Sequence, residues 1–185
     1  MRVISGSARG RPLKAVPGQH TRPTTDKVKE AIFSMIGPYF SGGTVLDLFA
    51  GTGGLGIEAL SRGAEYAVFV DLDRTSIAVV KSNLDATKFA GKAEVYRNEA
   101  VQAVKLLHKR GMKFDYIFLD PPYRMKQLDD LLLSMNEMGL INPSATIVME
   151  HDADQGYPDT IGTMNRKRYT QYGEIAVSIY KEGEV

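Results

Sequence analysis

The spacing of hydrophobic and polar positions changes several times along the chain, and each change predicts a new element. Short continuous apolar runs, which suit buried strands, lie at 44–49, 67–70, 93–96, 116–119 and 145–149. Between these runs, apolar residues recur at helical spacing, which predicts helices over 55–62, 74–89, 99–109 and 126–138. Because strands that alternate with helices of this length are typical of βαβ units, the body of the chain should be a parallel sheet covered on both faces.

The N-terminal part follows a different pattern, in which short apolar pieces alternate with turn formers. Val3-Ile4 and Leu13 flank a basic, turn-forming stretch, which predicts a small hairpin followed by a loop to about Arg22. Thr24 or Thr25 is then placed to cap a helix that ends at Gly37-Pro38. The apolar positions of this helix are Val28, Ala31, Ile32, Met35 and Ile36.

The C-terminal part also departs from the βαβ pattern. The runs at 166–170 and 175–180 are strand-like and meet around Gly173 with no helix between them, which predicts an antiparallel hairpin. We therefore expect an α/β, Rossmann-like fold: a mostly parallel seven-stranded sheet with a C-terminal antiparallel hairpin. Residues 1–40 should form a small N-terminal β-hairpin and helix extension and residues 41–185 the main domain, in one compact unit.

Composition excludes several classes of protein. Of the 185 residues, 43% are hydrophobic and 24% charged, as in ordinary soluble globular proteins. No apolar run reaches the roughly 20 residues of a membrane span, and the first residues lack the apolar core of a secretory signal. The absence of cysteine excludes disulfides and thiolate metal sites, and His20, His108 and His151 lack metal-site spacing. We expect a cytoplasmic monomer with no metal and no membrane association.

The net charge of +1 conceals an uneven distribution. Residues 1–30 carry seven Lys and Arg against two acids, whereas the remainder carries sixteen against twenty. A basic arm on a near-neutral body suits contacts with phosphates. A solvated loop with a chance excess of basic residues would give the same pattern.

A glycine-rich turn follows the first strand of the body and opens the next helix. Residues 51–56 read Gly-Thr-Gly-Gly-Leu-Gly, which satisfies GxGxxG, and Asp71 lies twenty residues beyond Gly51. These features are typical of a dinucleotide site, but they fit S-adenosylmethionine equally well. In either case the glycines let the backbone approach the ligand, and Asp71 is placed to accept hydrogen bonds from the ribose hydroxyls. Asp71 and Asp73 are also suited to capping the helix that begins near Arg74.

Asp47 discriminates between the two cofactors. It lies at the end of the first strand, four residues before Gly51, where a dinucleotide site would face a diphosphate. A carboxylate there would repel a diphosphate, but it would pair with the ammonium group of a methionine moiety. The alternative is that Asp47 only caps the turn or the helix through nearby amides.

The segment Asp120-Pro121-Pro122-Tyr123 directly follows the strand at 116–119, which places it at the carboxyl edge of the sheet beside the glycine-rich turn. Two consecutive prolines fix the backbone and remove two donors. The result is a rigid set of acceptors, the Asp120 carboxylate and the Pro121 carbonyl, with an aromatic ring next to them. The alternative is a strand-ending turn with Tyr123 in the core.

This set of acceptors suits one chemical problem. The lone pair of an exocyclic amine is delocalised into its purine ring, and accepting hydrogen bonds from its two N–H bonds favours the pyramidal geometry that attacks. Since the methyl group of S-adenosylmethionine is already activated, positioning and electrostatics should suffice. Tyr123 is placed to stack on an unpaired base, worth about 1–3 kcal/mol.

These motifs resemble those of a known family. Asp120 to Tyr123 resembles the catalytic motif of amino-methyltransferases that act on adenine or guanine, and residues 47–53 are similar to their cofactor motif. Residues 2–11 and 22–30, with Tyr172-Gly173, narrow the resemblance to RsmD-type 16S ribosomal RNA guanine-N2 methyltransferases. The resemblance covers essentially the whole chain and implies S-adenosyl-L-methionine as cofactor and ribosomal RNA, within the small ribosomal subunit, as partner.

The resemblance also implies roles for individual residues. Thr24 and Thr25 would reach the methionine carboxylate at a helix N-terminus, Asp47 its ammonium and Asp71 the ribose, while Glu99, longer than the usual Asp or Asn, would lie near adenine. The full cofactor set is Thr24, Thr25, Asp47, Phe49, Ala50, Gly51, Gly53, Asp71, Leu72, Glu99, Ala100 and Asp120, and the catalytic set is Asp120, Pro121, Pro122 and Tyr123. The residues expected to contact nucleic acid are Arg2, Arg9, Arg11, Lys14, Arg22, Arg166, Lys167 and Arg168.

Three other functions remain possible from the sequence. A DNA adenine-N6 methyltransferase uses the same acceptors, but such enzymes usually carry a sizeable target-recognition region, for which this chain has little room. A non-catalytic RNA-binding module on the same fold is disfavoured by the presence of Asp47, Gly51, Gly53 and Asp120. An NAD-dependent oxidoreductase is disfavoured by Asp47.

Overall fold

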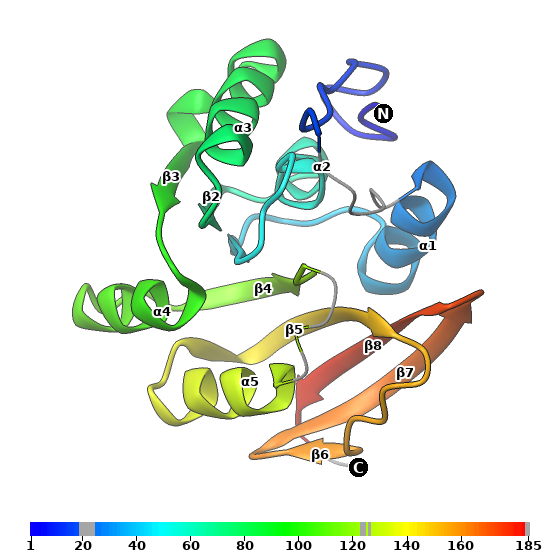
Figure 1. The fold of residues 1–185 in the computed structure, drawn as a ribbon, viewed down its shortest axis with the longest axis vertical. Helices are drawn as coiled ribbons and strands as arrows, with labels where there is room; N and C mark the ends of the chain where they lie inside the picture. Colours follow the sequence, from blue (N-terminus) through cyan, green and yellow to red (C-terminus); the bar gives the residue numbers. More distant parts are fainter. Residues whose placement is uncertain (19–24, 123–124, 126, 184–185) are drawn as a thin grey trace.

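The computed structural model describes residues 1–18, 25–122, 125 and 127–183 of the 185-residue chain. In these residues the strands form one sheet in the order β3-β2-β1-β4-β5-β8-β7-β6 (Figure 1). The strands are β1 (Thr44–Asp47), β2 (Tyr66–Asp71), β3 (Ala93–Arg97), β4 (Phe114–Leu119), β5 (Ile141–Asp152), β6 (Thr160–Ile161), β7 (Met164–Tyr172) and β8 (Ile175–Glu182). The helices are α1 (Asp26–Ile36), α2 (Gly54–Ser61), α3 (Arg74–Thr87), α4 (Ala100–Lys109) and α5 (Leu128–Glu137), with a short 3₁₀ turn, η1 (Ala90–Lys92).

The predicted Rossmann-like α/β fold is confirmed. Strands β1 to β5 pair in parallel, and β8 pairs antiparallel with both β5 and β7, which is the predicted terminal hairpin. In the described residues the sheet has one strand more than predicted, because Thr160 and Ile161 pair with the start of β7. A two-residue strand is too short for any periodicity in the sequence.

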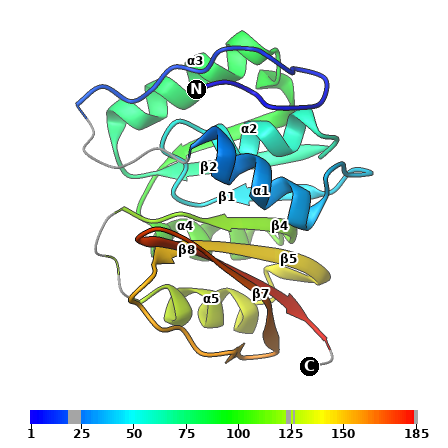
Figure 2. The ribbon, with the colours of Figure 1, turned by 90° about the vertical axis from the view of Figure 1, so that its right-hand side faces the viewer.

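Two hydrophobic clusters lie on opposite faces of the sheet. One contains Leu46, Ile117 and Ile147 with buried side chains of α4 and α5, such as Leu107 and Leu132. The other contains Val45, Phe118 and Val148 of the same strands with buried side chains of α1, α2 and α3. The alternation of neighbouring residues between the two clusters follows from the two-residue period of a strand. The sheet is therefore the middle layer between two layers of helices (Figure 2).

The N-terminal segment, residues 1–18, lies alongside α2 and α3 in both views (Figures 1 and 2). The predicted hairpin takes the form of one antiparallel bridge between Arg2 and Pro12, with the Val3 amide donating to the Arg11 carbonyl at 2.9 Å. Val3 and Leu13 are buried in the cluster that also holds α1, α2 and α3. The segment is thus part of that helical layer.

A buried carboxylate, Glu58 of α2, fastens the N-terminal segment. It accepts hydrogen bonds from the amides of Ile4 at 2.8 Å and Ser5 at 3.0 Å. It also pairs with Arg62 at 2.8 Å and with Lys29 of α1 at 3.5 Å, and all three charged side chains are at most 3% exposed. Burial lowers the pKa of Lys29, although the Glu58 charge opposes this shift. A buried charge is tolerated only where partners compensate its lost hydration, so these contacts hold the segment in one place.

A second attachment joins the N-terminal segment to the glycine-rich turn. The Asn83 side chain of α3 accepts from the Lys14 amide at 2.8 Å and donates to the Lys14 carbonyl at 3.1 Å. The same amide group donates to the carbonyl of Thr52 at 2.9 Å. Asn83 therefore fixes the end of the segment directly beside the turn that the sequence assigns to the cofactor.

Candidate active site

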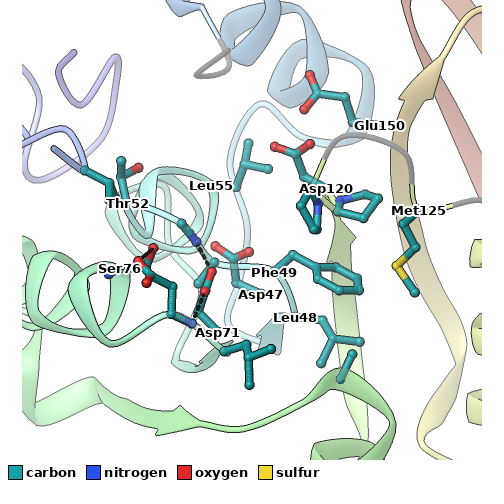
Figure 3. A pocket seen from close by; sticks show the side chains of 18 of the residues that line it. Asp47, Leu48, Phe49, Thr52, Leu55, Asp71, Ser76, Asp120, Met125 and Glu150 are labelled. Carbon is teal, nitrogen blue, oxygen red and sulfur yellow. Dashed lines mark hydrogen bonds between the residues drawn. The ribbon is translucent and has the colours of Figure 1, made fainter. Parts of the chain in front are cut away.

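The predicted site residues come together at the carboxyl edge of the parallel strands. Strand β1 lies between β2 and β4, so the connections diverge from β1 to both sides of the sheet. Open α/β sheets bind ligands at such a divergence, and a cavity of about 1030 Å³ lies here. The predicted residues that line it are Asp47, Phe49, Ala50, Gly51, Asp71, Leu72, Glu99, Ala100, Asp120, Pro121 and Pro122. Figure 3 shows the Asp47, Asp71 and Asp120 side chains around this common space.

Two other predicted cofactor residues have local roles and are not among the lining residues. Thr25 is the N-cap of α1, as its hydroxyl accepts from the Val28 amide at 3.2 Å. Gly53 precedes α2 with a φ of 80°, a left-handed conformation that glycine adopts without strain. The predictions for Thr24 and Tyr123 concern positions outside the described residues.

Asp47 is buried at the end of β1, with 2% of its surface exposed. Its carboxylate accepts a hydrogen bond from the Gly56 amide of α2 at 3.0 Å, which is the capping contact that the alternative predicted. Burial raises the pKa of Asp47 to about 7, because the Gly56 hydrogen bond only partly offsets the lost hydration. A cationic group in the cavity would stabilise the ionised form.

The close packing around Asp47 requires glycine at position 56. A Cβ atom there would lie 2.4 Å from the Phe69 ring and 3.2 Å from the Asp47 carboxylate. The absence of a side chain therefore lets α2 present its first-turn amide to the Asp47 carboxylate.

Asp71 organises the loop that faces it. One of its carboxylate oxygens accepts from the Gly51 amide at 2.8 Å and the other from the Asp73 amide at 2.9 Å. The helix-capping role suggested for these acids belongs to Asp73, whose side chain accepts from the Ser76 amide at 2.9 Å as N-cap of α3. Asp71 is half-buried and lines the cavity.

The part of the cavity beside the ends of β2 and β3 and the start of α4 is lined by both apolar and polar side chains. Leu72 is 59% exposed and Val101 is 51% exposed, although both are large apolar residues that line the cavity. Glu99 precedes α4 and makes no side-chain capping hydrogen bond with that helix. Sequence reasoning missed Arg97 and Asn98, which line the same end because β3 pairs beside β2.

Asp120, Pro121 and Pro122 occupy the edge beyond β4. The Pro122 carbonyl accepts a hydrogen bond at 3.3 Å from the amide of Met125, a further lining residue. Phe49, from the loop after β1, lines the same cavity as the two prolines. The three described residues of the predicted catalytic segment thus face the same cavity as Asp47.

A further wall of the cavity was not predicted from the sequence. It is built by the end of β5, the β7–β8 turn and the start of β8, and its residues are Glu150, His151, Asp152, Glu174 and Ile175. The buried His151 has a partner at each ring nitrogen, the Asp152 carbonyl at 2.8 Å and the Ser178 hydroxyl at 2.9 Å. Burial lowers its pKa. Strand pairing, which the sequence does not display, brings this wall to the site.

The N-terminal segment supplies the opposite wall. Met1, Ala15 and Val16 line the cavity together with Lys29 of α1. The ammonium group of Lys29 donates to the Arg2 carbonyl at 2.7 Å. The sequence suggested only a basic arm here, whereas the structure makes this segment part of the cavity.

The described residues among those predicted to contact nucleic acid are on the surface and are not among the lining residues. Arg2 pairs with Asp26 at 3.3 Å, and half-buried Arg166 pairs with Asp159 at 2.7 Å while its guanidinium lies 5.3 Å from the Tyr169 ring. The exposed ones are Arg2, Arg9, Arg11, Lys14, Lys167 and Arg168, and Arg22 lies outside the described residues.

The described part of the chain contains neither a metal-binding cluster nor a membrane-spanning helix. It contains no group of three or more His, Asp or Glu side chains arranged to hold a metal ion. None of its helices is both long and apolar enough to cross a membrane.

Comparison with known proteins gives the family. The model of the family described as "Conserved hypothetical protein 95" matches residues 1–181. The chain is 54% identical over 182 residues to "Putative rRNA methyltransferase YlbH" of Bacillus subtilis (strain 168), covering 98% of this chain and 99% of the relative. It is 33% identical over 181 residues to "Ribosomal RNA small subunit methyltransferase D" of Escherichia coli (strain K12), covering 98% and 89% of the two chains.

A solved structure agrees with this assignment. "Putative methyltransferase yhhF from Escherichia coli" superposes with a TM-score of 0.85 at 33% identity, covering 98% of this chain and 97% of that one. The chain therefore belongs to the RsmD-type family of S-adenosylmethionine-dependent ribosomal RNA methyltransferases.

Proposed function

We propose that this protein methylates the exocyclic N2 amine of a guanine in 16S ribosomal RNA, within the small ribosomal subunit. The observation that carries the proposal is that Asp120, Pro121 and Pro122 line the same cavity as the buried carboxylate Asp47. One cavity thus combines a site for a cationic methyl donor with hydrogen-bond acceptors for an amine.

The cavity residues fit S-adenosylmethionine. Asp47 is a buried carboxylate suited to the methionine ammonium, and Asp71 presents a second carboxylate at the end of β2 for the ribose. Leu72 and Val101 offer apolar surface to the adenine ring. When bound, S-adenosylmethionine supplies an electrophilic methyl group.

The protein's own contribution at the reacting atom is to orient the amine. The Asp120 carboxylate and the Pro121 carbonyl accept hydrogen bonds from its two N–H groups, which directs the nitrogen lone pair toward the methyl group. The C–N bond that forms would replace the methyl–sulfur bond of the donor, which would leave as a neutral thioether, and the nitrogen would lose a proton, for which Asp120 is the acceptor. Tyr123, adjacent in sequence, stacks on the base.

Ribosomal RNA as the substrate is supported by the printed names of the two relatives. The choice of guanine as the target base, and of its N2 atom, rests on the resemblance of residues 120–123 and the N-terminal motifs to those of RsmD-type enzymes. The exposed basic residues of the N-terminal segment and of β7 are suited to contact phosphates of the RNA around the target.

Replacement of Asp120 tests the proposal. Small subunits from a strain lacking the gene should accept radiolabelled methyl groups from the wild-type protein. Asp120→Ala should reduce the rate about 100- to 1000-fold, as the loss of one hydrogen-bonding group at a reacting centre does. Cofactor affinity, measured by calorimetry, should largely persist.

Two results would contradict this proposal. Full activity of Asp120→Ala would remove the residue from the reaction. Efficient labelling of adenine in duplex DNA, with none in small subunits, would assign the chain to the DNA methyltransferases.

A further inference from the structure

Glu150 lies next to Asp120 at the edge of the sheet. Leu119 of β4 is in register with Met149 of β5, so the residues that follow them occupy neighbouring positions on adjacent parallel strands. Such strands are about 4.8 Å apart. Both carboxylates line the cavity, and Figure 3 shows them projecting toward the same region of it.

The side chains of Asp120 and Glu150 share a direction for a simple reason. Leu119 and Met149 belong to the cluster beneath α4 and α5, whereas Phe118 and Val148 belong to the cluster on the other face. Because side chains alternate along a strand, Asp120 and Glu150 continue on the face of Phe118 and Val148. Glu150 is only 8% exposed, so it would contact a base inserted into the cavity and not RNA bound at the outer surface.

Guanine and adenine differ in the hydrogen bonds that two adjacent acceptors can accept. On guanine, the N2 amine is next to N1–H, so its Watson–Crick edge offers neighbouring donors. On adenine, the ring nitrogen next to the amine carries a lone pair, which a carboxylate would repel. A single acceptor set at Asp120 and Pro121 holds an amine of either base, whereas a second carboxylate beside it favours guanine.

We propose that Glu150 is the residue that selects guanine, by accepting a hydrogen bond from N1–H while Asp120 and Pro121 hold the N2 amine. This inference rests on the proposed function and adds the source of its base specificity. A well-placed hydrogen-bonding pair gives up to about 100-fold discrimination between bases.

The test uses 2-aminopurine, which keeps the exocyclic 2-amine but has a lone pair at N1. Small subunits are reconstituted with 16S RNA that carries either guanine or 2-aminopurine at the mapped target position, and kcat/KM is measured for each. The wild-type protein should prefer guanine by about 100-fold. In Glu150→Gln, whose amide can accept from N1–H or donate to a lone pair, the preference should fall at least tenfold.

A matched control separates this role from general damage. Glu182→Gln removes a carboxylate from the end of β8, away from the residues that line the cavity, and should keep the wild-type preference. Calorimetry with the cofactor and thermal unfolding should show that Glu150→Gln is folded and binds S-adenosylmethionine.

The possible failures are distinguishable. An unchanged preference in Glu150→Gln would overturn the role of Glu150. A wild-type protein that methylates both bases equally would also overturn it, and this measurement needs no variant. A wild-type protein that transfers no methyl group to the exocyclic 2-amine of the target base in either reconstituted small subunit would instead contradict the proposed function itself.

Discussion

Asp47 shows how a single residue reconciles folding with binding. A carboxylate that is 2% exposed loses most of its hydration, and its pKa rises to about 7 in consequence. The residue therefore destabilises the empty protein at neutral pH. This cost is understandable if the site exists to receive a cation, because a bound ammonium would restore the lost electrostatic stabilisation.

Asp47→Asn should make the empty protein more stable and the cofactor complex weaker. The folded pKa of about 7 lies above the usual value of 3.8, so Asp47 favours folding at low pH and loses this contribution as the pH rises from about 4 to 7. The melting temperature of Asp47→Asn should thus exceed that of wild type at pH 8, and the difference should shrink as the pH falls toward 4. Thermal unfolding at several pH values measures it.

Calorimetry on the same variant completes the test. Loss of a charge-assisted hydrogen bond to the ammonium should weaken cofactor binding by about 1.5–3 kcal/mol. Equal affinities for wild type and Asp47→Asn would show that Asp47 serves only as the acceptor for the Gly56 amide.

Residues that adjoin a recognisable motif could be predicted from the sequence, and residues that reach the site through pairing could not. Asp47, Asp71 and Asp120 each lie at or just beyond the end of an apolar strand, so the topology alone brings them to one edge. Glu150 also lies near a strand end, but its neighbour is set by the β4–β5 register. Register depends on contacts between distant segments.

At the scale of elements, the N-terminal segment is attached to α2 through the buried carboxylate of Glu58. The basic residues of the segment are evident in the sequence, but this attachment is not. The amides of Ile4 and Ser5, which donate to Glu58, lie 54 and 53 positions before it. A glutamate in the short, mostly apolar helix α2 gave no sign of this role.

Glu58→Gln should destabilise the protein by about 3–5 kcal/mol, because Lys29 and Arg62 would remain buried without a compensating charge. Chemical denaturation measures the change. Cofactor affinity should fall as well, since Met1, Ala15 and Val16 of the attached segment line the cavity.

The control for this variant is Glu65→Gln, which removes an exposed carboxylate and should change stability by less than about 0.5 kcal/mol. Equal stability of the two variants would show that the buried ion pairs do not hold the segment.

Element boundaries were predicted best where helices begin and end with capping chemistry. Thr25 was one of two candidates for the cap of α1, and the structure gives it that place. β5 begins four residues earlier than the predicted strand at 145–149 and ends three residues later, at Asp152. Its additional residues include Asn142 and Pro143, whose polar or turn-forming character concealed the strand.

At the scale of the whole molecule, the order of the strands explains why one cavity serves both binding and reaction. β1 and β4 are neighbours although β2 and β3 separate them in sequence, which brings Asp47 and Asp120 to the same edge. The antiparallel β8 extends this edge beside β5; the turn before it adds Glu174 to the cavity, and the first residue of β8 adds Ile175. The βαβ pattern predicted the parallel part of this arrangement, because alternating strands and helices admit few topologies.

The most direct test of the central claim is mass mapping of ribosomal RNA from three strains: one with the gene, one without it, and one that expresses Asp120→Ala. The proposed function predicts one N2-methylguanosine in 16S RNA that is present in the first strain, absent from the second and strongly reduced in the third. Identical 16S RNA in all three strains, or a lost methyl group on adenine, would contradict it.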